Sequence, residues 1–253
     1  MKRIIVNADD FGANEIVTSE IERMIVAEAV SSTTVMANGL CLEEVKQFAA
    51  VHPEVSFGVH LCLSEFSSLT KSEVLHQAGL IDETGHFIHK AVFRLQNLNE
   101  EMVQKAIRDE LNAQIDVVSS LGFPISHADS HHHVHTIFPL HEVFADVLHS
   151  RGIDKLRLCI GFNSLRSKAH LTKYLRHVWL NYYYRSHFIT ADHFTNYANY
   201  IKTDLSVRDG QVVELMCHPG HPAERYRTEM QLVEKKIAQI TSGVLLVSYN
   251  ELL

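Results

Sequence analysis

The chain has 253 residues, 46% of them hydrophobic, and its 23 Lys and Arg residues against 30 Asp and Glu residues give a formal net charge of −7. This composition is enough to bury one sizeable core, in one large α/β domain or two small ones. Nucleic acid and anionic membranes are poor candidate partners, because the balance is acidic and no basic run of five or more residues occurs.

Short β-type runs alternate with longer segments of helical periodicity in the first part of the chain. The expected elements are a strand at 4–6, a helix at 16–29, a strand at 33–36, a helix at 42–51 and a strand at 55–61. The segment 66–98 that follows is rich in Ser, Gly, His and Asp. We expect this segment to leave the core as an excursion or lid.

The same alternation continues to the end of the chain. The expected elements are a helix at 100–121, strands at 124–131 and 156–158 around a helix at 139–151, a helix at 165–187, a strand at 211–217, a helix after Pro222 and a strand at 244–247. Repeated βα units predict a parallel sheet with helices outside it. About seven strands in a single domain over 1–253 favour a complete or incomplete TIM-like β/α barrel, with a doubly wound open sheet as the alternative.

The beginning of the chain and its cysteines predict a cytoplasmic protein. The first apolar run is too short for a signal peptide, and no apolar run approaches the roughly 20 residues of a membrane span. The four cysteines have neither zinc-finger nor redox-motif spacing, so we expect free thiols in a reducing compartment.

Titratable side chains gather where four of the expected strands end. Asp9 and Asp10 end the first strand and His60 ends the third. A histidine-rich run at 127–135 ends a middle strand, and His218 follows a late one. Since ligands of both candidate architectures bind at the carboxyl ends of the strands, we expect these groups to share one site.

The adjacent acids Asp9 and Asp10 have two interpretations. They could form a solvated turn or helix cap, or one carboxylate could bind a metal while the other takes a proton from water. Successive residues of an extended strand point in opposite directions. The second interpretation therefore requires a twist at the strand end.

The histidine-rich run is the stronger signal for a metal, because imidazole binds Zn²⁺, Mn²⁺, Co²⁺ and Fe²⁺ well. In an extended segment His127, Asp129 and His131 share one face, and His133 and His135 continue it. Not all of them can be ligands, so we expect the others to orient a ligand, as Asp129 could do through a free imidazole N–H, or to contact substrate.

His60 and His218 are weaker signals when each is taken alone. Either could be a structural histidine, His60 bonded to a backbone carbonyl and His218 fixed in a tight turn before Pro219. In its functional interpretation, His218 protonates a leaving amine.

Four motifs in chain order resemble the YdjC family of carbohydrate deacetylases. They are Asn-Ala-Asp-Asp-Phe-Gly at 7–12, Gly-Val-His-Leu at 58–61, Asp-Ser-His-His-His-Val-His at 129–135 and Cys-His-Pro at 217–219. The resemblance implies a β/α-barrel-like fold, one divalent metal, usually Mg²⁺, and hydrolysis of N-acetyl groups from acetylated amino sugars such as chitooligosaccharides. The segments 66–98 and 160–205 carry no match, which leaves the identity of the sugar open.

The resemblance also implies roles for individual residues. By position, His60 and His131 match the metal histidines of the family, and Asp10 matches an aspartate that is a metal ligand or an acid/base. By looser similarity to polysaccharide deacetylases, Asp9 is the candidate base and His218 the candidate acid. The chain departs from the family at 126–129, where Ser-His-Ala-Asp stands in place of Thr-His-Leu-Asp.

Several alternatives remain open at this point. An Asp-His-His ligand set suits Zn²⁺, Mn²⁺ or Co²⁺ better than Mg²⁺, which prefers oxygen ligands. A phosphoesterase would need Lys or Arg near the strand ends, and the motifs contain none. A non-catalytic carbohydrate-binding module is the other rival. The three tyrosines at 182–184 could form a homodimer face, a sugar-stacking surface or part of the core.

Overall fold

The computed structural model describes residues 1–159, 168–196, 200, 208–223 and 244–253. Within these residues seven strands form one sheet in the order β4-β3-β2-β1-β6-β5, with β7 also paired to β1. Every pairing between these strands is parallel. The strands are β1 (Lys2–Phe11), β2 (Ser32–Val35), β3 (Ser56–Leu61), β4 (Ala128–Ser130), β5 (His193–Asn196), β6 (Val212–Cys217) and β7 (Val244–Leu246).

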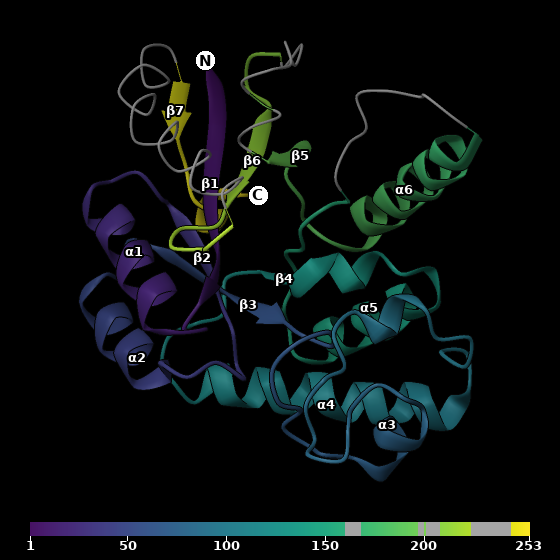
Figure 1. The fold of residues 1–253 in the computed structure, drawn as a ribbon. Helices are drawn as coiled ribbons and strands as arrows, with labels where there is room; N and C mark the ends of the chain where they lie inside the picture. The colour runs from purple at the N-terminus through teal and green to yellow at the C-terminus, as the bar shows by residue number, and fades with distance from the viewer. Residues whose placement is uncertain (160–167, 197–199, 201–207, 224–243) are drawn as a thin grey trace.

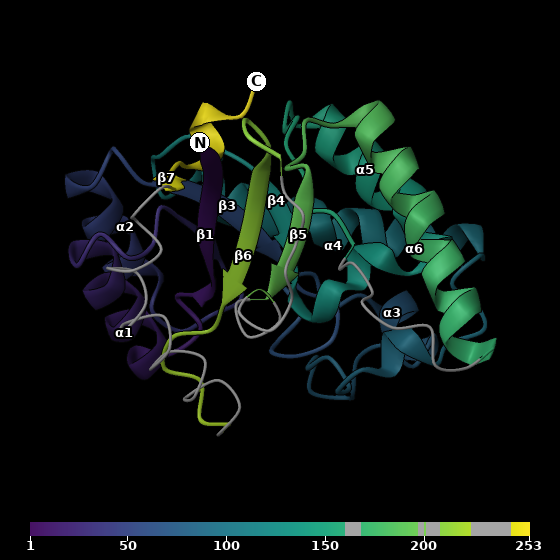
Figure 2. The same ribbon diagram turned by 90° about the horizontal axis from the view of Figure 1, so that it is seen from above.

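The helices lie outside the strands, with α1 and α2 on one flank and α4, α5 and α6 on the other (Figures 1 and 2). They are α1 (Glu15–Val26), α2 (Leu42–Val51), α3 (Glu73–Gln77), α4 (Glu101–Ser119), α5 (His141–Ser150) and α6 (Lys168–His187). Short 3₁₀ turns complete the fold, namely η1 (Ala91–Phe93), η2 (His131–Thr136), η3 (Phe138–Leu140) and η4 (Tyr249–Glu251). The curled parallel sheet is an incomplete TIM-like barrel, as the sequence predicts.

The central strand is β1, which is buried on both faces from Ile4 onward. Such continuous burial is typical of parallel strands covered by helices, and it explains why the strand lacks polar alternation. On the flank, α1 begins at the N-cap Asn14, whose side chain accepts a hydrogen bond from the backbone N–H of Val17. The main core runs through the sheet, and the four cysteines are buried thiols outside any disulfide.

Most of the expected elements are confirmed, with three differences. The strand expected at 124–131 covers only Ala128–Ser130, because 124–127 are irregular backbone and the chain turns into η2 at His131. At 156–158 there is only an isolated bridge, which pairs Leu156 with Ala128. Strand β5 was not predicted, because its four residues are mixed polar and apolar. The helix expected after Pro222 lies outside the described residues, and so do the first three residues, 165–167, of the helix expected at 165–187.

The segment 66–98 packs against the barrel. It contains α3, η1 and short antiparallel bridges. Its apolar side chains belong to the main core, among them Leu75, Leu80, Phe87 and Val92. A role as a lid stays a prediction. No helix of the described residues has the length and apolar character needed to cross a membrane.

Candidate metal centre and active site

Asp10, His60 and His131 come together at the carboxyl ends of the strands. Asp10 Oδ1 lies 3.1 Å from His60 Nε2 and 2.9 Å from His131 Nδ1. The two imidazole nitrogens are 3.3 Å apart. The donor atoms therefore converge from β1, β3 and the residue after β4, and they line a pocket of about 420 Å³.

The chemistry of this donor set fits a divalent metal. Burial alone would lower the pKa of His60, but the carboxylates of Asp129 and Asp10 outweigh it and raise the pKa to about 10. In the same way Asp10 and Glu65 raise the pKa of the half-buried His131 against the effect of burial. The cluster thus attracts positive charge. Two nitrogen donors and one carboxylate oxygen suit Zn²⁺, Mn²⁺ or Co²⁺.

The twist needed to bring Asp9 and Asp10 to one site is present at the end of β1. Asp10 has a positive φ of 72°, and the β1–β2 register shifts between Ala8 and Phe11. A residue other than glycine rarely adopts this conformation, which costs roughly 1–2 kcal/mol. The bulge turns Asp10 toward the two histidines, and both carboxylates line the pocket.

Asp129 orients His60 from the neighbouring strand. The β3–β4 register pairs the two residues, and Asp129 Oδ1 lies 2.6 Å from His60 Nδ1. Thr34 donates a hydrogen bond to the other oxygen of Asp129 over 3.2 Å. His60 is thereby held with Nε2 toward Asp10, in the carboxylate–histidine arrangement found behind many metal ligands.

His218 lies beside Asp9 because β6 is the other neighbour of β1. The register pairs Ala8 with Cys217, so the two following residues are neighbours across the strand ends. His218 Nε2 is 3.9 Å from Asp9 Oδ2. Burial lowers the pKa of His218, although the Asp9 and Asp10 carboxylates act in the opposite direction. His218 is therefore mainly neutral at neutral pH.

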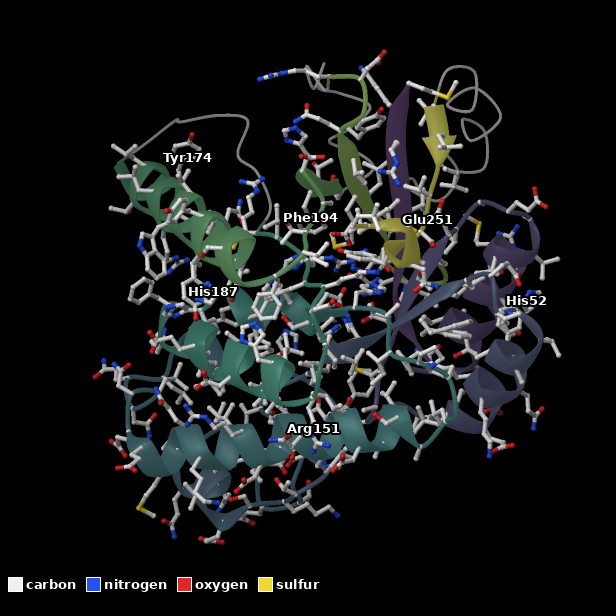
Figure 3. All side chains as sticks on the ribbon, turned by 180° about the vertical axis from the view of Figure 1, so that it is seen from behind. His52, Arg151, Tyr174, His187, Phe194 and Glu251 are labelled. Atoms are coloured by element: carbon white, nitrogen blue, oxygen red, sulfur yellow. The ribbon has the colours of Figure 1, made fainter. Side chains whose placement is uncertain are left out.

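Arg157 was missed by the sequence reasoning, although it joins most of the site. It has no exposed surface, and its guanidinium donates to Asp9, Asp129 and Glu214. Its carbon Cζ lies 4.9 Å from the ring centroid of Phe194. Phe194, labelled in Figure 3, belongs to β5. The signal that could have found it is a cation inside the apolar run Leu156–Leu158, where a charge needs a buried partner.

A family model described as YdjC-like protein matches residues 3–243. The chain belongs to the YdjC-like family.

Individual members and a solved structure support this assignment. A relative from Geobacillus stearothermophilus named carbohydrate deacetylase is 28% identical over 98% of this chain and 96% of its own. Another of that name, from Thermoanaerobacter pseudethanolicus, is 31% identical, but the match spans only 60% of this chain and 59% of that relative. A crystal structure from Enterococcus faecalis V583, named for cellobiose-phosphate cleavage, superposes with a TM-score of 0.73 at 25% identity, covering 98% of this chain and 97% of that one.

The histidine-rich run of this YdjC-like chain does not continue as one extended face, contrary to our expectation. His132 and His133 have positive φ values of 54° and 58°, so the backbone turns after His131. His133 still lines the pocket, but His135 is fully buried behind it and contacts Ser130. These two residues therefore do not extend the row of candidate ligands.

His127 lies beneath the pocket of the YdjC-like chain and does not line it. Its Nε2 is 3.0 Å from Asn7 Oδ1, and its ring stacks on Tyr249 with centroids 3.7 Å apart. Gly58 leaves room for this ring, because a Cβ there would lie 2.6 Å from His127 Cε1. The residue packs the core below the site and supports it from there.

Three pocket residues of this family member carried no sequence signal. Glu65 lines the pocket from the loop after β3, Lys90 from the position before η1 and Phe93 from the end of η1. Each lies in a stretch without recognisable periodicity. Their place depends on how 66–98 folds back onto the barrel, which local sequence does not encode.

Proposed function

We propose that the protein is a metal-dependent hydrolase that removes N-acetyl groups from acetylated amino sugars of the chitooligosaccharide type. The observation that carries the proposal is the convergence of Asp10, His60 and His131 at one pocket that Asp9 and His218 also line. The relatives named carbohydrate deacetylase support the same chemistry.

The metal would be held by Asp10 Oδ1, His60 Nε2 and His131 Nδ1. When bound, it would act as a Lewis acid on the acetyl carbonyl and lower the pKa of a water. The two nitrogens favour Zn²⁺, Mn²⁺ or Co²⁺ on chemical grounds, whereas the family resemblance favours Mg²⁺. We propose the nitrogen-preferring metals.

Asp9 would serve as the base. Burial would raise its pKa, but Arg157 outweighs that effect and holds the pKa well below its usual range. Asp9 is therefore ionised whenever the enzyme works. One of its oxygens, Oδ2, faces His218. As water adds to the carbonyl, Asp9 takes the proton that water loses.

His218 would deliver a proton to the departing nitrogen. The amide C–N bond breaks, the nitrogen leaves as a free amine, and the acetyl group leaves as acetate. Because His218 and Asp9 Oδ2 are 3.9 Å apart, the proton taken up at the carboxylate has a short route to the imidazole. Once His218 has taken up that proton it is an imidazolium, and its lowered pKa makes it a ready donor to the leaving nitrogen.

The rival functions make different demands on the same site. A phosphoesterase would need a cation free to hold phosphate; Arg157 is already bound to three carboxylates, so among the described pocket residues Lys90 would have to supply it. A non-catalytic sugar-binding module would need neither Asp9 nor His218. Asp9→Asn would then leave sugar binding intact and have no turnover to reduce.

The test is an acetate-release assay on N-acetylated mono- and disaccharides, with and without a phosphate substituent, before and after treatment with a chelator. We expect release that is lost with the metal and restored by Zn²⁺, Mn²⁺ or Co²⁺. His60→Ala and His131→Ala should lose bound metal and activity together, and the surface variant His76→Ala should lose neither. Full metal occupancy in His131→Ala would contradict the ligand assignment, and phosphate release from model esters without acetate release would favour the phosphoesterase.

A further inference from the structure

The two ring nitrogens of His131 face two different carboxylates. Nδ1 lies 2.9 Å from Asp10 Oδ1, and Nε2 lies 3.0 Å from Glu65 Oε2. Nδ1 is also the nitrogen near His60. If Nδ1 is the ligand atom, the proton of the neutral imidazole must be on Nε2, where Glu65 accepts it.

The loop after β3 surrounds His131 and its neighbour with three consecutive side chains. Ser64 Oγ is 2.8 Å from His132 Nδ1, Glu65 contacts His131, and the Phe66 ring meets His131 edge-on at 6.2 Å between centroids. Phe66 has a positive φ of 65°. A bulky residue is strained in this region, so the surrounding structure must impose the conformation.

Two buried polar residues of α4 hold this loop from behind. Gln114 exchanges two hydrogen bonds with the backbone of Cys62, at 2.8 and 2.7 Å. Gln114 also donates to Glu110, which is fully buried and accepts bonds from 68–70. The loop is thus fixed at both ends of the stretch that reaches His131. From this held backbone Glu65 presents a half-exposed carboxylate to His131.

We propose that Glu65 is a positioning residue for the metal ligand His131. Its carboxylate selects the imidazole tautomer with the proton on Nε2 and turns Nδ1 toward Asp10 and His60. The inference rests on the proposed function only in that Asp10, His60 and His131 bind a metal. It assigns a role to a residue that has no place in the proposed proton transfers.

A different arrangement would use the same atoms for a second ion. Glu65, His131 and His132 also form a compact donor group, and His132 Nε2 lies 4.0 Å from Glu65 Oε2. Such an ion would need His131 to lose its last ring proton and bridge two metals. A hydrogen bond from Nε2–H to a carboxylate requires no such deprotonation, which is why we favour the positioning role.

Calorimetric titration of the metal-free protein with Zn²⁺ or Mn²⁺ tests this inference. We expect one ion per chain, with affinity 10- to 100-fold weaker in Glu65→Ala. The loss should be smaller in Glu65→Gln, because its amide oxygen still accepts from Nε2–H. Glu83→Ala, on the exposed part of the same segment, is the matched control and should bind as the unaltered protein does.

Two outcomes would overturn the positioning role. One is unaltered affinity in Glu65→Ala. The other is that the unaltered chain binds two ions, whereas Glu65→Ala and His132→Ala each bind one. That result would establish the second metal site. Metal binding is measured without turnover. The two proposals can therefore fail separately. If the chain binds one metal with an affinity that depends on Glu65 but releases no acetate, the proposed function is contradicted and this inference stands.

Discussion

Arg157 and Asp9 form a two-pronged ion pair at the pocket, with Asp9 in its lining and Arg157 behind it. The guanidinium nitrogens lie 2.7 Å from Asp9 Oδ2 and 2.7 Å from Asp9 Oδ1, and both side chains are excluded from solvent. Asn7 donates a further hydrogen bond to Asp9 Oδ1. This fork fixes the carboxylate in one orientation, with its Oδ2 facing His218.

Removal of the guanidinium should destabilise the whole protein. Arg157→Ala leaves Asp9, Asp129 and Glu214 buried without their shared cation, and breaking such a pair costs about 3–5 kcal/mol. Arg157→Lys keeps the charge but loses the fork, so we expect a folded protein with reduced turnover. Urea unfolding and acetate release check the two variants.

The control for Arg157 is Arg151, which pairs with Asp116 at the surface. Exposed pairs contribute at most about 1 kcal/mol, so Arg151→Ala should change the free energy of unfolding little. Equal effects of Arg157→Ala and Arg151→Ala would contradict the view that the buried cation holds the site together.

Replacement of Asp9 and of Asp10 by Asn should have different effects on metal binding and turnover. Asp10→Asn removes a proposed ligand oxygen, so we expect metal affinity and turnover to fall together. Asp9→Asn keeps the ligand set, so the metal should still bind while turnover falls by about 10²-fold or more. Metal content measured beside acetate release distinguishes the two roles. Loss of metal in Asp9→Asn, or normal turnover in it, would show that Asp9 is not the base.

The sequence was sufficient for the part of the site that follows strand ends. Asp10, His60 and His131 could be brought together before any coordinates, because carboxyl ends of parallel strands meet at one edge. Arg157 and Glu65 could not, since Arg157 lies inside an expected strand and Glu65 in the loop after another, and neither stands at a strand end. Their contacts depend on strand register and on how loops fold back, which local periodicity does not encode.

The turn at η2 was missed for a related reason. Outside glycine positive φ values are uncommon, although Asn, Asp and His adopt them more often than other residues, and here they occur at two successive histidines, His132 and His133. Three consecutive histidines after a strand therefore suggested a longer strand. The surrounding contacts, not the residue types, impose the turn that leaves His131 as the last of the run to join Asp10 and His60.

Tyr249 connects the C-terminal turn η4 to the same buried cation. Its hydroxyl donates to Glu214 Oε2 at 2.6 Å, and Glu214 Oε1 accepts from Arg157 at 2.7 Å. Burial raises the pKa of Glu214 to about 7, against the effect of Arg157. Tyr249→Phe leaves a buried carboxylate oxygen without its donor, which costs about 1–3 kcal/mol.

Thermal and urea unfolding of Tyr249→Phe measure this loss. Tyr182→Phe is the matched control, because Tyr182 is 75% exposed on α6 and should tolerate the change. Tyr184, two residues later, is buried in the core. If Tyr249→Phe were as stable as the control, the hydroxyl would contribute nothing to holding Glu214 and Arg157 in place.

His135 should make the protein sensitive to mild acid. Burial, supported by the nearby positive charge of Arg157, holds the pKa of His135 well below 6.5. Below pH 6.5 the unfolded chain therefore binds a proton at this residue that the folded chain does not, and stability falls as pH falls. The loss attributable to one such histidine is about 2 kcal/mol between pH 6.5 and pH 5.

His60 shifts in the opposite direction and does not hide this effect. Because the pKa of His60 is about 10 in the folded chain, its protonation stabilises the metal-free fold fully below pH 6.5. This stabilisation is lost progressively as the pH rises from 6.5 through 10. The free energy of unfolding from urea titrations of metal-free protein at pH 5, 6 and 7 is the measurement. His135→Asn keeps an acceptor for the Ser130 hydroxyl and removes the titrating ring, so it should lower stability at pH 7 and flatten the decline toward pH 5. An unchanged slope would show that His135 does not carry the acid sensitivity.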